Sequence, residues 1–313
     1  MPELPDVVVY LEHIERVALG HRLDALELHT PFILRSVDPP AAEFAGKKLV
    51  ATRRIGKRLV LEFEAGPDRS DPLFAVIHLM VAGRLHWYPP SRKADRTRSQ
   101  FSFRFGNGQL RLTEAGTKRR ASLHLVRGEQ LLSTFDPGGI EVLGPTGKPA
   151  CKLKEFAERL RAENHTLKRT LTDPTVFSGI GGAYADEIMH RAKVSPVALT
   201  QKLDDAEVKR LHVASAAVLH EWVVRLRAEY DGKFPEGVTA FRPEMNVHGK
   251  FGQPCPVCGT PVQRIVYAER ETNYCPVCQT DGKLLADRAL SRLLRSDWPK
   301  TLEELENLKR KEP

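Results

Sequence analysis

Residues 255–278 read CPVCGTPVQRIVYAERETNYCPVC and hold four of the five cysteines in the chain. Cys255 and Cys258 form one C-x2-C pair, and Cys275 and Cys278 form a second after 16 intervening residues. Two such pairs can converge on one tetrahedral ion, and four thiolates are typical of a closed structural zinc site. The segment is short and polar, so metal binding would supply much of its folding free energy. We interpret it as a β-hairpin zinc finger; a dithiol redox pair, a disulfide pair and an iron site are the alternatives.

The residues between the two cysteine pairs predict the hairpin itself. Residues 263–274 are expected to form two short strands with a polar turn at residues 269–273 and Arg270 at its tip. An arginine held on a metal-stabilised hairpin can contact a phosphate or a base edge. A solvated loop arginine explains the spacing equally well.

The charge of the chain favours a polyanionic partner. The 313 residues include 48 basic and 40 acidic side chains, which gives a net charge of +8. No apolar run reaches the roughly 18 residues that a membrane span needs, and no signal-like segment opens the chain. We therefore expect a cytoplasmic monomer without a membrane segment. In that compartment Cys151 would be a lone reduced thiol without a catalytic role.

The first half of the chain predicts one helix followed by a β-sandwich or barrel. Val7, Leu11 and Ile14 share one face of a helix near the N-terminus. Residues 23–132 then alternate with a period of about two. Residues 101–105 and 110–113 flank Asn107-Gly108 as a hairpin, and residues 49–63 and 74–87 are further strand candidates.

The second half predicts helices. A Gly/Pro-rich stretch at residues 136–150 marks a linker. Helical periodicity follows at residues 153–160, 167–171, 183–192 and 205–230, and again in an amphipathic tail around residues 285–295. Thr301 to Glu304 indicates a capping box for a last short helix. The expected fold class is α+β and multidomain, with segments 1–135, 136–150, 151–247, 248–282 and 283–313.

A glycine-rich turn joins two of the predicted helices. Gly179-Ile180-Gly181 precedes Tyr184-Ala185-Asp186-Glu187. Glycines at a helix start let backbone N–H groups approach an anion, and the helix dipole favours the negative charge. A glycine in a plain helical hairpin is the alternative interpretation.

Several of these stretches, in this order, resemble the formamidopyrimidine-DNA glycosylase / endonuclease VIII family. The similarity covers residue 1 to about residue 282. It rests on Pro2-Glu3-Leu4-Pro5, Ile55-Gly56-Lys57-Arg58, His78-Leu79 with Ala82-Gly83, the glycine turn with Tyr184 to Glu187, and Gly249-Lys250 before the cysteines. The resemblance implies an N-terminal β-sandwich with flanking helices, a helical domain with a helix–two-turn–helix motif, and a four-cysteine zinc finger that holds one structural zinc ion.

The resemblance also implies catalytic roles. Removal of Met1 would leave Pro2 with a free secondary amine, and a chain-terminal amine has a pKa near 8, against about 10.4 for lysine. That amine would attack C1′ of a damaged nucleotide and form a Schiff base. Glu3 would be the general acid and base. Lys57 would contact the DNA backbone, and Arg270 would contact phosphates and assist the second elimination.

The implied DNA contacts include several departures from the family pattern. Val81 stands where a wedge methionine is usual, and Met80 precedes it. The loop at residues 114–121 lacks the usual stacking phenylalanine, with Arg119 the counterpart of its arginine. Gly182 replaces an asparagine, and Asp6 replaces a glutamate. The full set of expected DNA contacts is Met80, Val81, Lys118, Arg119, Lys168, Gly181, Gly182, Tyr184 and Lys250.

The sequence thus predicts a bifunctional DNA glycosylase/AP lyase of base-excision repair. It would bind damaged DNA, remove an oxidised base and cleave the strand by β- and δ-elimination. The departures favour lesions that are already unstacked. Two alternatives remain: a catalytically weak damage-binding protein of the same fold, and an RNA-binding zinc-ribbon protein.

Overall fold

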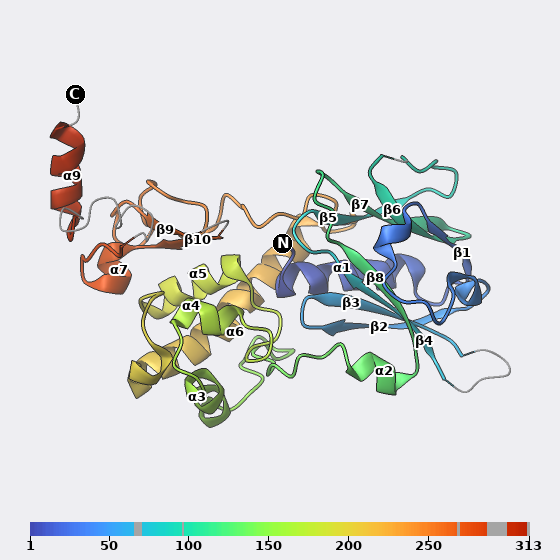
Figure 1. The fold of residues 1–313 in the computed structure, drawn as a ribbon, viewed down its shortest axis with the longest axis horizontal. Coiled ribbons are helices and arrows are strands. Elements are labelled where there is room, and N and C mark those ends of the chain that lie inside the picture. Colours follow the sequence, from blue (N-terminus) through green and yellow to red (C-terminus); the bar gives the residue numbers. More distant parts are fainter. Residues whose placement is uncertain (66–70, 96, 268–269, 287–298, 312–313) are drawn as a thin grey trace. The chain divides into compact units, whose positions relative to one another are not determined.

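The computed structural model describes residues 1–65, 71–95, 97–267, 270–286 and 299–311. The chain forms two compact units (Figure 1). Unit 1 consists of Met1–Gly139 and Glu221–Ala240, and unit 2 consists of Ile140–His220 and Phe241–Pro313. The unit boundary after Gly139 falls within the predicted linker.

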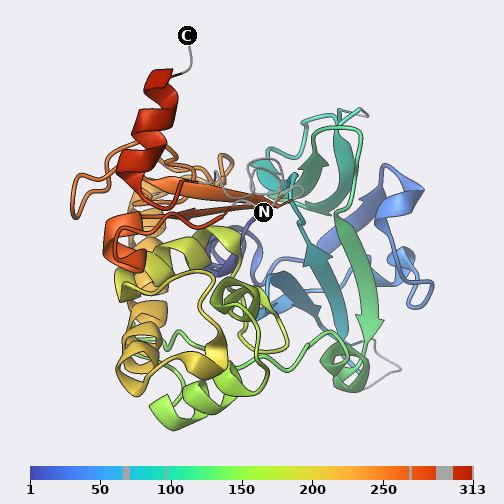
Figure 2. The same ribbon diagram turned by 60° about the vertical axis from the view of Figure 1, so that its left-hand side comes forward.

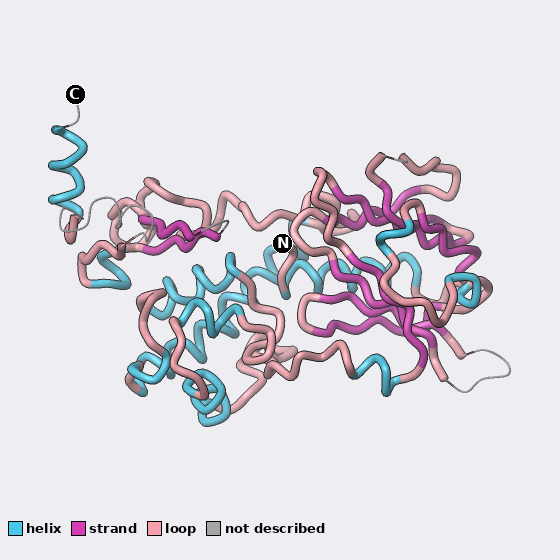
Figure 3. The backbone as a smooth tube through the Cα atoms, in the orientation of Figure 1, coloured by secondary structure: helices cyan, strands magenta, loops and turns pink. Residues whose placement is uncertain are grey.

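Unit 1 holds two four-stranded antiparallel sheets (Figure 3, strands in magenta). One has the order β1-β6-β7-β5 and the other the order β2-β3-β4-β8. The first comprises β1 (Leu23–Leu28), β6 (Ser99–Phe105), β7 (Gly108–Glu114) and β5 (Gly83–Tyr88). The second comprises β2 (Leu49–Ile55), β3 (Arg58–Phe63), β4 (Leu73–His78) and β8 (Ser122–Arg127).

The core of unit 1 draws side chains from both sheets, which confirms the predicted β-sandwich. Leu59, Leu61 and Phe63 alternate along β3 and join Phe101 and Phe103 of β6 in one buried cluster. The intervening residue Val60 points into a second cluster with Leu132 of α2 (Glu129–Ser133). The second sheet is therefore buried on both of its faces.

The predicted hairpin is confirmed, and the two longer strand candidates each divide. β6 and β7 pair with Phe105 opposite Gly108. The 49–63 candidate splits at Gly56-Lys57, and the 74–87 candidate splits at residues 79–82. Residues 79–82 are all apolar, so periodicity did not mark that turn, whereas Gly56-Lys57-Arg58 interrupts the apolar pattern and is a local turn signal.

Short helical segments complete unit 1. The predicted N-terminal helix is α1 (Leu4–Ala18), which buries Val7, Tyr10 and Ile14 in the sandwich core. Two 3-10 turns, η1 (Pro31–Ile33) and η2 (Ala41–Phe44), lie between β1 and β2. The final residues of α6 (Asp205–Glu229) belong to unit 1, where Leu226 packs against Val9.

Unit 2 contains the predicted helices (Figure 3, cyan). They are α3 (Leu153–Arg161), α4 (Leu167–Thr172), α5 (Gly182–Ala192) and the first part of α6, with the 3-10 turn η3 (Thr200–Lys202) before α6. The predicted hairpin of the cysteine segment is β9 (Gln263–Tyr267) and β10 (Arg270–Tyr274), followed by α7 (Pro276–Thr280). β10 packs beside α5 (Figure 2).

The C-terminal extension is described in part. The predicted last helix is α9 (Leu302–Lys311), and the Glu304 N–H donates to Thr301 Oγ1 at 3.3 Å, which is one of the two bonds of a capping box; the Glu304 carboxylate accepts the Lys300 N–H at 2.6 Å. Most of the predicted amphipathic stretch, residues 287–298, lies outside the described residues. Within the described part of the chain, every helix is too short or too polar to cross a lipid bilayer.

Candidate active site, nucleic-acid interface and metal centre

The N-terminus of unit 1 is a buried, hydrogen-bonded structure. Glu3 is the N-cap of α1, and its side chain accepts the N–H of Asp6. In return the Glu3 N–H donates to Asp6 Oδ2 at 2.9 Å. Pro2 is buried, and Glu3 is only 3% exposed. Asp6, a departure from the family pattern, thus completes the capping box that fixes the first residues of the chain.

Lys57 lies in the two-residue turn between β2 and β3. Gly56 has a φ of +58°, which a non-glycine residue adopts at a cost, and Ile55 pairs with Arg58 on either side. Burial lowers the pKa of Lys57, and the negative charge of Glu3 acts in the opposite direction.

The chain-terminal amine lies in the same environment as Lys57. Burial lowers the pKa of the Met1 amine, Glu3 raises it, and the positive charges of Arg84 and Lys57 lower it. The predicted residues Pro2, Glu3 and Lys57 therefore meet in one electrostatic environment within unit 1.

A neutral histidine lies beside this cluster. His78 ends β4 and pairs with Arg58 in the register of the sheet. Burial lowers the pKa of His78 to about 4, and the positive charges of Arg58 and Lys57 contribute to the same shift. His78 is therefore an uncharged imidazole near pH 7.

The turn between β4 and β5 presents the predicted wedge residue. Val81 is 61% exposed, whereas Met80 is partly buried and has a φ of +52°. Arg84 braces the turn, because its Nη1 donates to the Val81 carbonyl at 3.0 Å and to the Gly83 carbonyl at 2.7 Å. Of the two candidates, Val81 is thus the side chain that protrudes.

The loop at residues 115–120 is exposed and basic. Its start is fixed by the buried Glu114, whose Oε1 accepts the N–H groups of Arg120 at 2.8 Å and Ala121 at 3.1 Å. Arg119 reaches back to the Thr97 carbonyl, with an Nη2 to oxygen distance of 2.5 Å. Lys118 and Arg119 are therefore exposed basic side chains on the surface of unit 1.

In unit 2 the predicted glycine turn precedes α5. Gly179 has a φ of +79°, Gly181 is the N-cap of α5, and Gly182 is its first residue. Tyr184 is 2% exposed, so it acts as a packed side chain. A Cβ at Gly182 would meet nothing within 4 Å, which leaves open space at the helix start.

Two buried carboxylates of α5 hold the cysteine segment. Glu187 accepts four hydrogen bonds at 2.7 to 3.0 Å, from the N–H groups of residues 246–248 and from the Asn246 side chain. Asp186 binds His248 Nδ1 at 2.8 Å and the Asn273 N–H at 3.2 Å. Both carboxylates are 1% exposed or less. They connect α5 to residues 246–248, ahead of the cysteine segment, and to Asn273 of β10.

Lys168 belongs to the same network. Its Nζ lies 2.7 Å from Asp186 Oδ1 and 2.8 Å from the Glu271 carbonyl. The ammonium of Lys168 therefore neutralises a buried carboxylate and supports β10. Lys250 is half-buried, and its N–H donates to the Val247 carbonyl at 3.1 Å.

Arg270 begins β10, where it pairs with Tyr267. The expected turn at residues 269–273 was therefore wrong, since residues 270–274 form a strand. The polar residues 271–273 suggested a turn, but Asn273 is buried and bonded to Asp186. The two connecting residues and the Arg270 side chain lie outside the described part of the structure.

The four cysteines of the segment converge in unit 2. Their sulfur atoms all lie within 4.8 Å of one another, with Cys255–Cys278 at 4.0 Å and Cys258–Cys275 at 3.4 Å. Tetrahedral thiolate coordination of zinc places sulfurs about 3.8 Å apart, given metal–sulfur bonds of about 2.3 Å. All five cysteines of the chain are free thiols, so the structure contains no disulfide pair. The donor set and spacing fit a structural metal ion.

The surroundings of this metal centre were missed by sequence reasoning. His190 of α5 places Nε2 3.3 Å from Cys255 Sγ, and Gln279 bonds both the Cys275 N–H and the Val194 carbonyl at 2.9 Å. Such outer partners orient metal ligands. The Tyr184-Ala185-Asp186-Glu187 motif was visible in the sequence, but its partners at residues 246–248 and Asn273 lie 59 to 87 residues away in the chain.

Comparison with known proteins identifies the family. The sequence model of the formamidopyrimidine-DNA glycosylase N-terminal domain matches residues 1–121, that of the H2TH domain matches residues 143–229, and that of the zinc finger found in FPG and IleRS matches residues 252–280. A formamidopyrimidine-DNA glycosylase from Symbiobacterium thermophilum is 31% identical over 299 residues, which cover 92% of this chain and 93% of the relative. The chain belongs to the formamidopyrimidine-DNA glycosylase family.

Solved structures of this family support the same assignment. A Lactococcus lactis Fpg in complex with abasic-site DNA matches with a TM-score of 0.76 and 26% identity, over 89% of this chain and 99% of that chain. A complex of the Lactococcus lactis enzyme with an oxidised pyrimidine in DNA matches with a TM-score of 0.75 and 25% identity, over 89% and 100%. The chain is a DNA-repair N-glycosylase with a helical H2TH domain and a four-cysteine finger.

Proposed function

We propose that this glycosylase is bifunctional and removes oxidised bases through a Schiff base on Pro2, followed by β- and δ-elimination. The observation that carries the proposal is the meeting of the half-buried Met1 amine, Glu3 and Lys57 in unit 1. Removal of Met1 would make the secondary amine of Pro2 the new chain terminus. Its nitrogen would bond C1′ of the damaged nucleotide while the bond from C1′ to the base breaks.

Glu3 and Lys57 have separate roles in this scheme. Glu3 follows Pro2 directly and is held by the capping box, so its carboxyl can protonate the sugar ring oxygen as the ring opens to the Schiff base. Lys57 would contact the DNA backbone at the lesion and support the eliminations. Arg270 of the finger would contact phosphates and assist the second elimination.

The four cysteines would hold one structural zinc ion. Zinc would stabilise the β9–β10 hairpin, and the Asp186 and Glu187 network would fix that hairpin to α5. Removal of the ion with a chelator should abolish tight binding to abasic DNA. In a Trp298→Phe background, the fluorescence of the two remaining tryptophans, Trp87 and Trp222 of unit 1, should be retained.

The departures from the family pattern bear on the choice of substrate. Val81 reaches less far than methionine, and the 115–120 loop offers no aromatic ring. Filling the space left by a flipped nucleotide is then less favourable. We infer a preference for abasic, bulged or single-stranded lesions. Equal excision rates on duplex 8-oxoguanine and on bulged or single-stranded lesions would contradict it.

The test is borohydride trapping on duplexes that carry an abasic site, 8-oxoguanine or dihydrouracil. Wild type is compared with Pro2→Gly and Glu3→Gln. We expect a covalent adduct on abasic DNA, reduced at least about 100-fold by Pro2→Gly. Protein with Met1 removed that binds damaged DNA but traps on none of the duplexes would overturn the proposal. That result would instead favour a catalytically weak damage-binding protein, an alternative that the altered 115–120 loop also suggests.

A further inference from the structure

Phe32 is an aromatic ring held out into solvent on a well-anchored segment of unit 1. Its side chain is 78% exposed, whereas Ile33 beside it is 2% exposed and packs in the sandwich core. Both residues belong to the 3-10 turn η1. A single exposed apolar residue is common and does not by itself indicate a binding site. The residues around Phe32 therefore determine whether it could bind a ligand.

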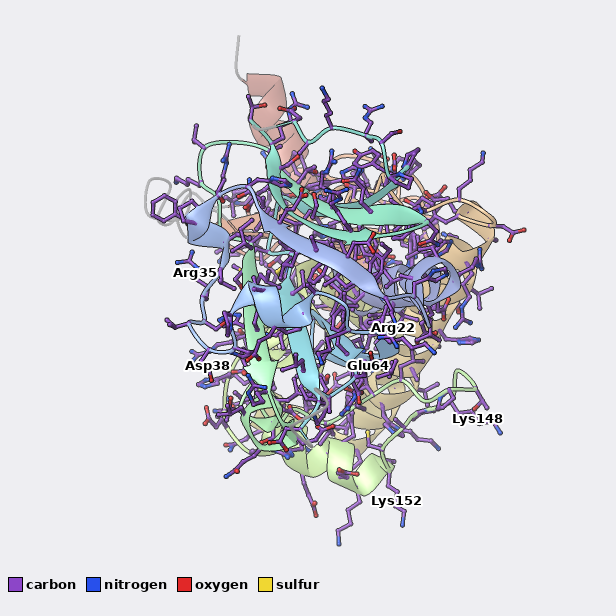
Figure 4. All side chains as sticks on the ribbon, turned by 90° about the vertical axis from the view of Figure 1, so that its right-hand side faces the viewer. Arg22, Arg35, Asp38, Glu64, Lys148 and Lys152 are labelled. Carbon is purple, nitrogen blue, oxygen red and sulfur yellow. The ribbon has the colours of Figure 1, made fainter. Side chains whose placement is uncertain are left out.

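The backbone around Phe32 is tied to both sheets. The N–H groups of His29 and Thr30 donate to the Gln100 carbonyl of β6 at 2.9 and 3.3 Å. On the other side, the Arg35 N–H donates to the Leu123 carbonyl of β8 at 2.9 Å. Figure 4 labels Arg35 at the edge of this segment. The aromatic ring is therefore presented by a fixed backbone, so little conformational entropy opposes its use in binding.

Phe32 forms part of the wall of a hollow of about 430 Å³. The 115–120 loop and the residue before it form another part of the wall, through Glu114, Thr117 and Arg119. The Arg119 side chain is held at Thr97, and Glu114 fixes the return of the loop at Ala121. The exposed ring and the basic loop therefore border one concave surface within unit 1.

The chemistry of this hollow suits a nucleobase. A phenyl ring stacks on any base, and a guanidinium stacks on a base or bonds its edge. Lys118, Arg119 and Arg120 are exposed beside it, which favours a polyanion over a neutral aromatic partner.

We propose that Phe32 and Arg119 receive the base left unpaired opposite a flipped nucleotide, with Phe32 as the stacking residue. The ring would thus be supplied by the segment between β1 and β2, since the 115–120 loop carries none. This inference rests on the proposed function, because flipping leaves the partner base unpaired.

The test uses Phe32→Ala, the conservative variant Phe32→Trp, and Val37→Ala as a control. Val37 is 96% exposed and follows on the same segment. The probe is a duplex with a tetrahydrofuran abasic analogue and 2-aminopurine opposite it. Fluorescence anisotropy gives the Kd, and 2-aminopurine emission reports on stacking of the opposite base.

We expect Phe32→Ala to weaken binding about tenfold and to increase 2-aminopurine emission in the saturated complex. Phe32→Trp should restore the affinity and keep the emission low, and Val37→Ala should behave as wild type. Unchanged affinity and emission in Phe32→Ala would overturn the proposal. Borohydride trapping of wild type on abasic DNA is run in parallel. If wild type is trapped but Phe32→Ala leaves affinity and emission unchanged, only the role of Phe32 is contradicted. If wild type is not trapped, the proposed function is contradicted.

Discussion

At the scale of single residues, two amines of unit 1 are candidates for the nucleophile. Burial lowers the pKa of both the Met1 amine, which occupies the chain terminus in this structure, and Lys57, and this leaves more of each amine unprotonated at neutral pH. The terminal amine has the lower ordinary pKa, near 8 against about 10.4. Glu3 also follows Pro2 directly in the chain. Both considerations favour Pro2 over Lys57.

The neutral state of His78 predicts a pH dependence of stability. Its pKa is about 4 in the folded protein, against about 6.5 in an unfolded chain. Between these values the unfolded state binds the proton and the folded state does not, so stability falls as the pH falls. A gap of this size corresponds to at most about 3.4 kcal/mol.

Urea unfolding at pH 7 and pH 4.5 measures this effect. His78→Gln should lose less stability between these two values than wild type does. The exposed His21→Gln serves as the control and should follow wild type. An identical loss in wild type and His78→Gln would show that the pKa of His78 is not lowered in the folded protein.

Residues within one motif were easier to predict than partners far apart. The spacing of the four cysteines predicted their convergence, and the start of the chain predicted the Pro2-Glu3 pair. The bonds from Asp186 and Glu187 to residues 246–248 and Asn273 were not predictable, because no local pattern relates them. Lys168 was expected to contact DNA, yet its ammonium is bonded within this network.

At the scale of elements, the β4–β5 turn depends on one glycine. A Cβ on Gly83 would lie 2.3 Å from the Leu79 carbonyl oxygen, which bonds the Gly83 N–H at 2.9 Å. Gly83→Ala should therefore displace Val81, reduce trapping at least tenfold, and cost about 1–3 kcal/mol of stability. Single-turnover trapping and urea unfolding measure these effects.

Gly106→Ala is the matched control for Gly83→Ala, since its Cβ would meet nothing within 4 Å. Equal behaviour of the two variants would contradict this account of the turn.

The attachment of the finger to α5 depends on the two side-chain oxygens of Glu187, which accept four hydrogen bonds. In Glu187→Gln an amide N–H₂ would replace one acceptor oxygen and face N–H donors of residues 246–248. We expect a loss of about 1–3 kcal/mol, together with faster hydrogen exchange at these amides. Exposed Glu244→Gln on the same segment is the control. Protection factors at residues 246–248 that match wild type would rule out this role.

The existence of the helices and of the β-sandwich was predicted, whereas the turns that position the site were not. Period-two and helical patterns located α1, the β6–β7 hairpin and α3 to α6. The turn at residues 79–82 was missed because all four residues are apolar, whereas the turn at Gly56-Lys57 did carry a local signal, a glycine followed by two basic residues. Each requires a special glycine geometry, a positive φ at Gly56 and a close backbone contact at Gly83. Lys57 and Val81 lie in these two turns.

At the scale of the whole molecule, the chain is organised as two units, where the sequence suggested five consecutive segments. Glu221–Ala240 belongs to unit 1 although it follows the helical region in the chain. The helical pattern of residues 205–230 runs without interruption through that point. Periodicity shows that a helix forms, but it does not show which core each part of the helix joins.

The central claim is that the terminal amine of Pro2, and not Lys57, forms the covalent bond to DNA. Borohydride-trapped wild type on abasic DNA is digested with nuclease and trypsin, and the peptides are analysed by mass spectrometry. The account predicts the sugar adduct on the N-terminal peptide, residues 2–16, at its first nitrogen. An adduct on Lys57, within an uncleaved peptide of residues 55–58, would contradict the account.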